Sequence, residues 1–299
     1  MVVAQVDRSP VPRWSAVLSG VPRMVGAAPP TVQVLAAIVS VQVGAALAKQ
    51  LFATTGTAGT VTLRLVLAAV VLVALWRPSL RANRRAIPVI VAYGVVLGVM
   101  NLCFYAALDR IPLGIAVTVE FLGPLAVALA GSRRWLDGLW ALLAASGVVL
   151  LANTGGDVSV VGLLLALAAG ACWAGYILLS AALGSRTTDG SGLALAAVVS
   201  GLLVAPFGFA GAGTALLAPG VLLAGLGVAL MSSVIPYSLE LKALRSIPPR
   251  VFGVLMSLEP AVAAVAGLLV LGEQLRPPQW IAIVCVVAAS AGATRYARQ

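Results

Sequence analysis

The stretch RIPLGIAVTVEFLGPLAVALAG, residues 110–131, decides the fold. It places one carboxylate, Glu120, in an otherwise apolar run, and a diverged copy of it occurs later in the chain. The second copy lies 136 positions further along the chain and carries its own carboxylate, Glu259. The prolines keep their places in both copies, with Pro112 corresponding to Pro248 and Pro124 to Pro260. The chain is therefore predicted to be built twice over, with an acid at helical depth in each half.

The composition is that of a membrane protein. Apolar residues make up 61% of the chain and charged residues 9%, with a mean hydropathy of +1.08. The net charge of +10 does not indicate a nucleic-acid partner, because the excess is arginine in short gaps between apolar runs. The three cysteines lie in apolar segments at unrelated spacings, so no disulfide framework, metal site or cofactor is predicted. Because the chain has no histidine, any proton chemistry must use carboxylates.

Ten apolar segments follow a Pro-rich start, residues 1–30, which we interpret as a disordered cytoplasmic tail. Each segment approaches the roughly 20 residues needed to cross ~30 Å of hydrocarbon. Continuous Leu, Ala and Val runs lack the alternation of barrel strands, so the sequence predicts an all-α polytopic membrane protein with ten transmembrane helices. The segments are 31–53, 57–76, 87–108, 113–131, 137–154, 160–183, 191–211, 217–239, 250–271 and 278–297.

The arginines predict the orientation. If the chain starts in the cytoplasm, the basic residues of the gaps fall inside, except Arg110 and Arg276. This bias predicts an even number of membrane spans with both ends of the chain cytoplasmic. The gap before the first copy then lies outside and the gap before the second lies inside, so two five-helix halves, 31–155 and 156–299, are predicted to be inverted repeats. Inverted repeats are typical of carriers whose single site faces either side of the membrane in turn.

Four charged residues lie inside predicted helices, where a charge costs several kcal/mol unless it is paired or hydrated. Lys49 is expected roughly 6 Å below the outer edge, and Arg64 and Glu120 roughly 10 Å below it. Asn101 has a similar depth, so these side chains are predicted to converge on one outward-facing polar pocket. Glu259, about 13 Å from the cytoplasmic end of its helix, is expected near the midplane.

Each of these charges also has a structural interpretation. Lys49 is shallow enough to snorkel to the outer interface. Arg64 and Glu120 could form a purely structural ion pair. Glu259 precedes a proline and could be a protonated hydrogen-bonder at a kink. Glu240, at the cytoplasmic end of its helix, is expected to be solvated.

Aromatic and small polar residues give weaker signals. An aromatic face could receive an ammonium group, although interfacial or packing roles are equally open; the candidates are Tyr105, Trp173, Tyr176 and Tyr237. Ser40, Gln42 and Gly44 form a small polar face that suits helix packing or substrate contact. Helix breaks that expose backbone carbonyls are predicted at Pro124, Pro236 and Pro260.

Seven stretches in order along the chain carry a family resemblance. They are SVQVGAALAKQLF (40–52), TLRLVLA (62–68), GVMNLCFYAAL (98–108), RIPLGIAVTVEFLGPLAVAL (110–129), GACWAGYILLS (170–180), IPYSLE (235–240) and FGVLMSLEPAVAAVAGLLVLGE (252–273). With them the chain resembles the EamA-type drug/metabolite transporter superfamily, and within it the bacterial threonine and homoserine exporters. The resemblance implies export of small neutral amino acids across the inner membrane, in exchange for protons.

The resulting hypothesis is alternating access around a cavity between the halves. A zwitterion needs a cation for its carboxylate and an anion or aromatic face for its ammonium group. The predicted substrate-binding residues are Lys49, Arg64, Asn101, Tyr105, Glu120, Trp173, Tyr176 and Tyr237. Glu259, with Glu120, is the predicted proton carrier, because burial disfavours a charged carboxyl. Export of drugs or other metabolites, or channel activity, remains an alternative; an enzyme is not expected without histidine, paired intramembrane aspartates or a large polar loop.

Overall fold

The computed structural model describes residues 28–130, 135–153, 158–184, 186–187, 190–244 and 246–296. Within these ranges every regular element is helical. The predicted tail lies outside the described residues except for its last three positions, and the predicted boundary between the halves, between residues 155 and 156, lies outside them too.

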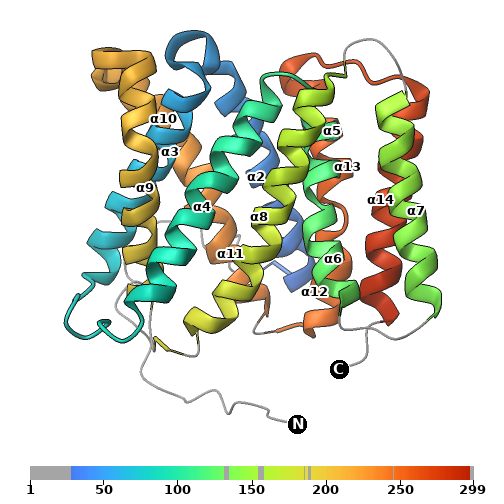
Figure 1. Cartoon of the computed structure of the whole chain (residues 1–299), viewed down its shortest axis with the longest axis horizontal. Helices are drawn as coiled ribbons and strands as arrows, with labels where there is room; N and C mark the ends of the chain where they lie inside the picture. Colours follow the sequence, from blue (N-terminus) through green and yellow to red (C-terminus); the bar gives the residue numbers. More distant parts are fainter. Residues whose placement is uncertain are drawn as a thin grey trace.

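The helices run up and down side by side (Figure 1). The predicted first half contains α2 (Pro30–Gln50), α3 (Phe52–Trp76), α4 (Ile87–Leu108), α5 (Leu113–Glu120), α6 (Leu122–Ala130) and α7 (Trp135–Asn153). The predicted second half contains α8 (Val160–Gly184), α9 (Ser191–Ala212), η3 (Gly213–Leu217), α10 (Pro219–Ala229), η4 (Leu230–Val234), α11 (Ile235–Leu244), α12 (Pro249–Met256), α13 (Glu259–Ala266), η5 (Gly267–Leu271) and α14 (Pro277–Tyr296).

Eight helices or nearly continuous helical runs are long and apolar enough to cross a membrane. The other two predicted segments are also helical, but their apolar parts are shorter, at Trp135–Leu151 and Pro219–Val234. The outer surface is apolar: Leu142, Leu202 and Leu223 are each about 70% exposed. Lipid tails would cover such side chains, so the chain is a multi-pass membrane protein.

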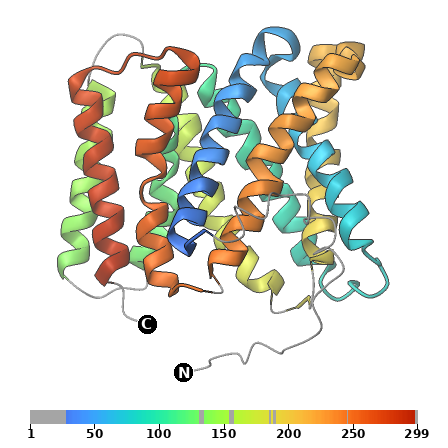
Figure 2. The same cartoon turned by 180° about the vertical axis from the view of Figure 1, so that it is seen from behind.

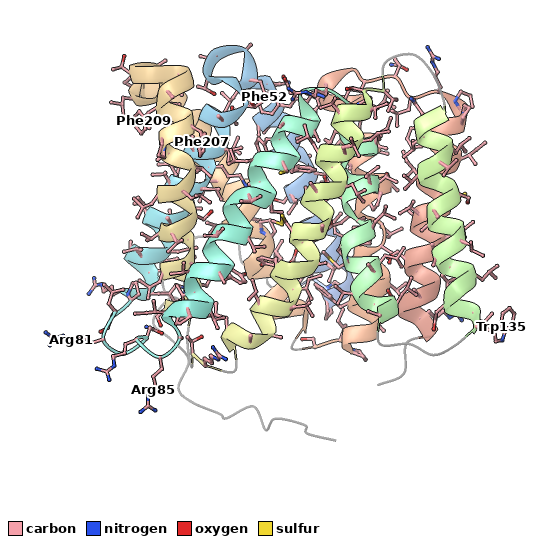
Figure 3. The ribbon with its side chains drawn as sticks, viewed as in Figure 1. Phe52, Arg81, Arg85, Trp135, Phe207 and Phe209 are labelled. Carbon is pink, nitrogen blue, oxygen red and sulfur yellow. The ribbon has the colours of Figure 1, made fainter. Side chains whose placement is uncertain are left out.

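The two ends of the bundle differ in charge. We call the lower end the one at which α2 begins and α14 ends, and the upper end the one at which α2 passes into α3 (Figures 1 and 2). Arg81 and Arg85 project from the lower end, whereas Phe52 marks the upper end (Figure 3). The gap between α3 and α4 therefore brings its arginines to the end where the described chain both starts and finishes.

Each helix of the first half packs chiefly against one from the second half. The main partners are α2 with α11, α3 with α9, α4 with α8, α5 with α13, and α7 with α14. Figure 2 shows α2 seated between α11 and α13, while α7 and α14 form a pair at one edge. Small residues allow the closest crossings: a Cβ on Gly114 of α5 would lie 2.6 Å from Ala264 Cα of α13.

The repeated stretch breaks at the same place in both copies. The first copy is interrupted at Phe121, between α5 and α6, and the second at Ser257 and Leu258, between α12 and α13. Both copies also begin alike, because Pro112 and Pro248 are extended N-caps with ψ of 146° and 141°. The repeat seen in the sequence is thus also a repeat of backbone geometry.

A third interruption lies between α10 and α11. Here η4 is one turn of π-helix, and Pro236 is the second residue of the α11 helix that follows it. A π-turn leaves one carbonyl out of the helical ladder, and Ser40 of α2 donates a hydrogen bond of 2.8 Å to the Met231 carbonyl in this turn. The small polar face of α2 therefore packs on the irregular turn.

Candidate functional site

A cavity of about 240 Å³ lies in the middle of the bundle, between the two halves. The first half contributes residues from α2, α3, α4 and α5, and the second half from α8, η4, α11, α12 and α13. The lining residues are Val41, Gln42, Ala45, Arg64, Met100, Asn101, Phe104, Val117, Glu120, Trp173, Tyr176, Ser232, Pro236, Glu240, Met256 and Glu259.

The residues that line the cavity lie on one face of each helix that contributes several of them. Residues three or four positions apart share a helix face, and the lining residues of one helix have this spacing. Trp173 and Tyr176 are three apart on α8, and Ser232, Pro236 and Glu240 are four apart along η4 and α11. Each element therefore turns one stripe of side chains to the cavity.

The cavity gathers three of the four charges found inside predicted helices. Arg64, Glu120 and Glu259 all line it, and the two carboxylates are only 8% and 5% exposed. Asn101 also lines it and donates to the Leu97 carbonyl at 2.9 Å. These side chains converge between the helices rather than on the lipid-facing surface.

Arg64 is oriented by Tyr105. The guanidinium Nη1 donates to the phenol oxygen at 2.9 Å, and the guanidinium carbon lies 5.5 Å from the centre of the ring. Tyr105 is fully buried and is not among the residues that line the cavity. The hydrogen bond and the cation–π contact together hold a permanent positive charge at the cavity wall.

Three prolines each remove a backbone hydrogen-bond donor beside the cavity. A proline has no N–H for the carbonyl four residues before it. Pro124, Pro236 and Pro260 therefore leave the carbonyls of Glu120, Ser232 and Met256 without their usual helical donor, and these three residues all line the cavity. Glu120 and Met256 are also the last residues of α5 and α12. Since helix C-termini carry partial negative charge, this part of the wall attracts cations.

Two aromatic side chains complete the wall on α8. Trp173 packs edge-on against Phe121, with ring centres 5.6 Å apart, at the break that follows Glu120. Tyr176 packs against Tyr93 at 4.8 Å. Both of the predicted aromatic residues on α8 therefore line the cavity and are braced by a second ring.

Lys49, the fourth of the charged residues inside predicted helices, does not line the cavity. Its Nζ forms an ion pair of 2.8 Å with Glu273 and donates to the Ile111 carbonyl at 3.1 Å. The second carboxylate oxygen of Glu273 accepts from the Leu113 N–H at 2.8 Å. We call Lys49, Ile111, Leu113 and Glu273 the upper ion-pair cluster, because it ties α2 and the start of α5 to the segment after η5 at the upper end. The side chain of Tyr237, on α11, lies outside the described part of the chain.

Sequence reasoning missed several of these residues. Glu240 was expected only to be solvated near the end of its helix; the structure places it, partly buried, in the lining of the cavity. Its spacing of four from Pro236 was an available signal. Glu273 is 224 positions from Lys49, and no local pattern links the two.

Apolar helices in a bundle that surround a buried, charge-lined cavity define a multi-pass membrane transporter. Residues 160–295 match the EamA-like transporter family. The chain is 46% identical over 275 residues to the threonine/homoserine exporter RhtA of Escherichia coli K12, covering 90% of this chain and 92% of that protein. It therefore belongs to the EamA-like transporter family, in the branch of the threonine/homoserine exporters, as its motifs indicated.

Other relatives agree. RhtA of Salmonella typhimurium strain LT2 is 44% identical over 270 residues, covering 89% of this chain and 91% of that protein. The uncharacterized transporter YwfM of Bacillus subtilis is 29% identical over 229 residues, covering 72% and 76%. A solved structure shares the fold with a TM-score of 0.56 and 21% identity, covering 90% of this chain and 99% of that chain. The sequence relatives from Escherichia coli, Salmonella typhimurium and Bacillus subtilis are named exporters or transporters, in line with the expectation that the chain is not an enzyme.

Proposed function

We propose that the protein is a secondary transporter of the inner membrane that exports small neutral amino acids of the threonine and homoserine type in exchange for protons. One observation carries the proposal: a buried cavity between the halves combines Arg64 with Glu120 and Glu259. An amino acid is a zwitterion, and its two charged ends require charges of both signs when water is removed.

Each end of a zwitterion has a matching part of the wall. Arg64, held by Tyr105, offers a guanidinium fork to the substrate carboxylate. Glu120, the C-termini of α5 and α12 and the face of Trp173 offer acceptors to the ammonium group. Lys49 was the other candidate for the carboxylate, but in our proposal it serves the upper ion-pair cluster.

The size of the cavity supports a small solute. Its volume of about 240 Å³ is below the roughly 300–1,000 Å³ typical of sites for drug-sized ligands. The alternative, export of drugs through the same fold, would require a larger or more apolar space than this one.

The acids support proton exchange. Glu120, Glu240 and Glu259 line the cavity, whereas Arg64 is the one basic residue among the described residues that line it. Several carboxyl groups that share a site with a single cation favour the uptake of protons, because neighbouring negative charges disfavour ionisation. We assign the coupling proton to Glu259, with Glu120 shared between proton and substrate.

The packing of the halves supports alternating access. In the repeat, the equivalent helices are α2 and α8, α3 and α9, α4 and α10–α11, α5–α6 and α12–α13, and α7 and α14. The contact between α2 and α11 is then equivalent to the contact between α8 and α4. Each of the other main contacts joins a helix to its own equivalent, so the packing of the bundle is symmetric. An arrangement with this symmetry can rock so that either end opens. The upper ion-pair cluster would keep the upper end closed and would break when that end opens.

The orientation of the bundle is part of the proposal. The arginines of the gap between α3 and α4 lie at the lower end with the start of α2 and the end of α14. Cytoplasmic loops are enriched in Lys and Arg, so we place the lower end in the cytoplasm and the upper ion-pair cluster on the outer side.

The test is an uptake panel of radiolabelled amino acids in inside-out vesicles, with and without an imposed pH gradient. Export in the cell appears as uptake here, so threonine and homoserine should accumulate, and more strongly when the vesicle interior is acidic. Vesicles without the protein and vesicles loaded with a proton ionophore are the controls. Uptake of lipophilic drugs without uptake of amino acids would support the alternative, and flux that never concentrates would indicate a channel.

A further inference from the structure

Two neutral polar side chains at the cavity have unused hydrogen-bonding capacity. Gln42 on α2 is 2% exposed and Ser232 on η4 is 5% exposed, and both line the cavity. Neither Gln42 Oε1 nor Ser232 Oγ has a hydrogen-bond partner among the described residues. Both oxygen atoms have less than 1 Å² of accessible surface, so a side-chain rotation must bring them to the cavity before they can meet a ligand. Leaving such a group buried and unsatisfied costs about 1–3 kcal/mol, and a hydrogen bond to a ligand would remove that cost.

The backbone holds the two groups on one wall. Ser40, two residues before Gln42, donates to the Met231 carbonyl, which is adjacent to Ser232. Gly44 allows the close approach, because a Cβ at that position would lie 2.6 Å from Ser232 Oγ. The π-turn of η4 is part of this arrangement, and π-turns inside helices are frequent at functional sites.

Chemistry limits what this wall can recognise. The charged ends of an amino acid are matched by Arg64 and by the carboxylates with the helix C-termini. Gln42 offers a carbonyl acceptor, and Ser232 offers a hydroxyl that can donate. A substrate hydroxyl both donates and accepts, so it would satisfy both groups at once.

We propose that Gln42 and Ser232 form the specificity site for the side-chain hydroxyl of the exported amino acid. This inference rests on the proposed function and names the feature that distinguishes a hydroxy amino acid from its apolar analogues. A site that hydrogen-bonds a substrate hydroxyl rejects analogues that lack it, because the polar groups of the site are then left unpaired. A methyl group in place of the hydroxyl would leave both Gln42 Oε1 and Ser232 Oγ unsatisfied.

The experiment measures transport of threonine against 2-aminobutyrate, which has the same skeleton without the hydroxyl, in proteoliposomes. The variants are Ser232→Ala and the nearly isosteric Gln42→Met, each of which should lower the threonine preference roughly fivefold to tenfold. Transport of 2-aminobutyrate should change little. Ser200→Ala is the matched control, because Ser200 Oγ is also buried without a partner but the residue does not line the cavity.

The outcomes separate the two proposals. If the wild-type protein transports threonine but both variants keep its preference, or lose both substrates equally, the hydroxyl site is wrong and the exporter proposal stands. Equal transport of threonine and 2-aminobutyrate by the wild-type protein would also show that the hydroxyl site is wrong while the exporter proposal stands. If it transports neither threonine nor homoserine, the exporter proposal fails and the hydroxyl site fails with it.

Discussion

At the scale of single residues, the cavity is defined by charges that could not remain in lipid. Arg64, Glu120 and Glu259 were predicted as functional candidates because a charge inside an apolar helix is costly unless it finds a partner or water. All three line one cavity. The cost of a buried charge does not identify functional neutral residues, because Gln42 and Ser232 can lie in a membrane helix at little cost. Only their joint position at the cavity distinguishes them from packing residues.

Glu259→Gln tests the proton carrier. Glutamine keeps the shape of the side chain but cannot carry a proton, so threonine–threonine exchange should persist while the response to an imposed pH gradient falls at least fivefold. Flux of labelled threonine in proteoliposomes, measured with and without the gradient, gives both numbers. Asp109→Asn, at an exposed carboxylate outside the cavity, is the control. An undiminished response in Glu259→Gln, with loss in Glu240→Gln, would move the assignment to Glu240.

At the scale of elements, the interrupted helices contribute features to the cavity that the continuous helices do not. The prolines predicted that breaks exist, but not that Glu120, Ser232 and Met256, each four residues before one of them, would all line one cavity. That convergence depends on how α5, η4 and α12 pack, which no local pattern in the sequence encodes. The π-turn was likewise unpredicted, and the hydrogen bond that Ser40 of α2 donates to its Met231 carbonyl joins residues 191 positions apart.

Pro260→Ala tests the break between α12 and α13. Alanine supplies the N–H that proline lacks, so the carbonyl of Met256 can rejoin the helical ladder and the break beside the cavity is repaired. Transport of threonine should fall about tenfold, while the melting temperature in detergent changes little, because the regained hydrogen bond offsets the freedom that alanine adds to the unfolded chain. Pro206→Ala is the matched control, since Pro206 lies inside α9 and does not line the cavity. Equal effects of the two substitutions would show that the break has no special role.

Gly170→Ala tests the crossing of α8 with α5. A Cβ at this position would lie 2.6 Å from the Glu120 carbonyl oxygen, so one backbone must move. Overpacking of this kind costs about 1–3 kcal/mol, and the melting temperature should drop by several degrees. The control is Gly175→Ala on the same helix. A Cβ on Gly175 would meet only a side-chain carbon of Val96 at 3.8 Å, so this substitution should not lower the melting temperature. A drop of similar size in both variants would contradict the role of the crossing.

At the scale of the whole molecule, the upper ion-pair cluster joins the two halves across 224 positions of sequence. The sequence allowed Lys49 to be either a substrate ligand or a residue that snorkels to the interface. The ion pair with Glu273 is a third role, which depends on tertiary structure. Hydropathy alone, in contrast, was enough to locate the helical segments, because the need to satisfy every backbone hydrogen bond in lipid leaves few alternatives.

Glu273→Gln tests the closure of the upper end. The amide still accepts from Leu113 but no longer attracts Lys49, so the upper end should open more often. The probe is Ala45→Cys, at the cavity wall, in a background that lacks Cys103, Cys172 and Cys285. Its labelling by an impermeant maleimide from the outer side should accelerate severalfold.

The control for this closure test is Arg110→Gln. It removes an exposed ion pair of 3.8 Å between neighbouring residues of the same half and should not change the labelling rate. If Glu273→Gln labels no faster than its parent, the cluster does not hold the upper end closed.

The pairing of every first-half helix with a second-half helix also constrains biosynthesis. While the ribosome is still translating the second half, α3, α4 and α5 lack their main packing partners, and the charged groups of Arg64 and Glu120 remain exposed to a bilayer that solvates neither. Completion of the polypeptide is therefore the step that shelters these groups, and a chain truncated after α7 should be a substrate for membrane quality-control proteases rather than a stable half-protein. Two separately translated fragments should regain stability only when both are inserted together.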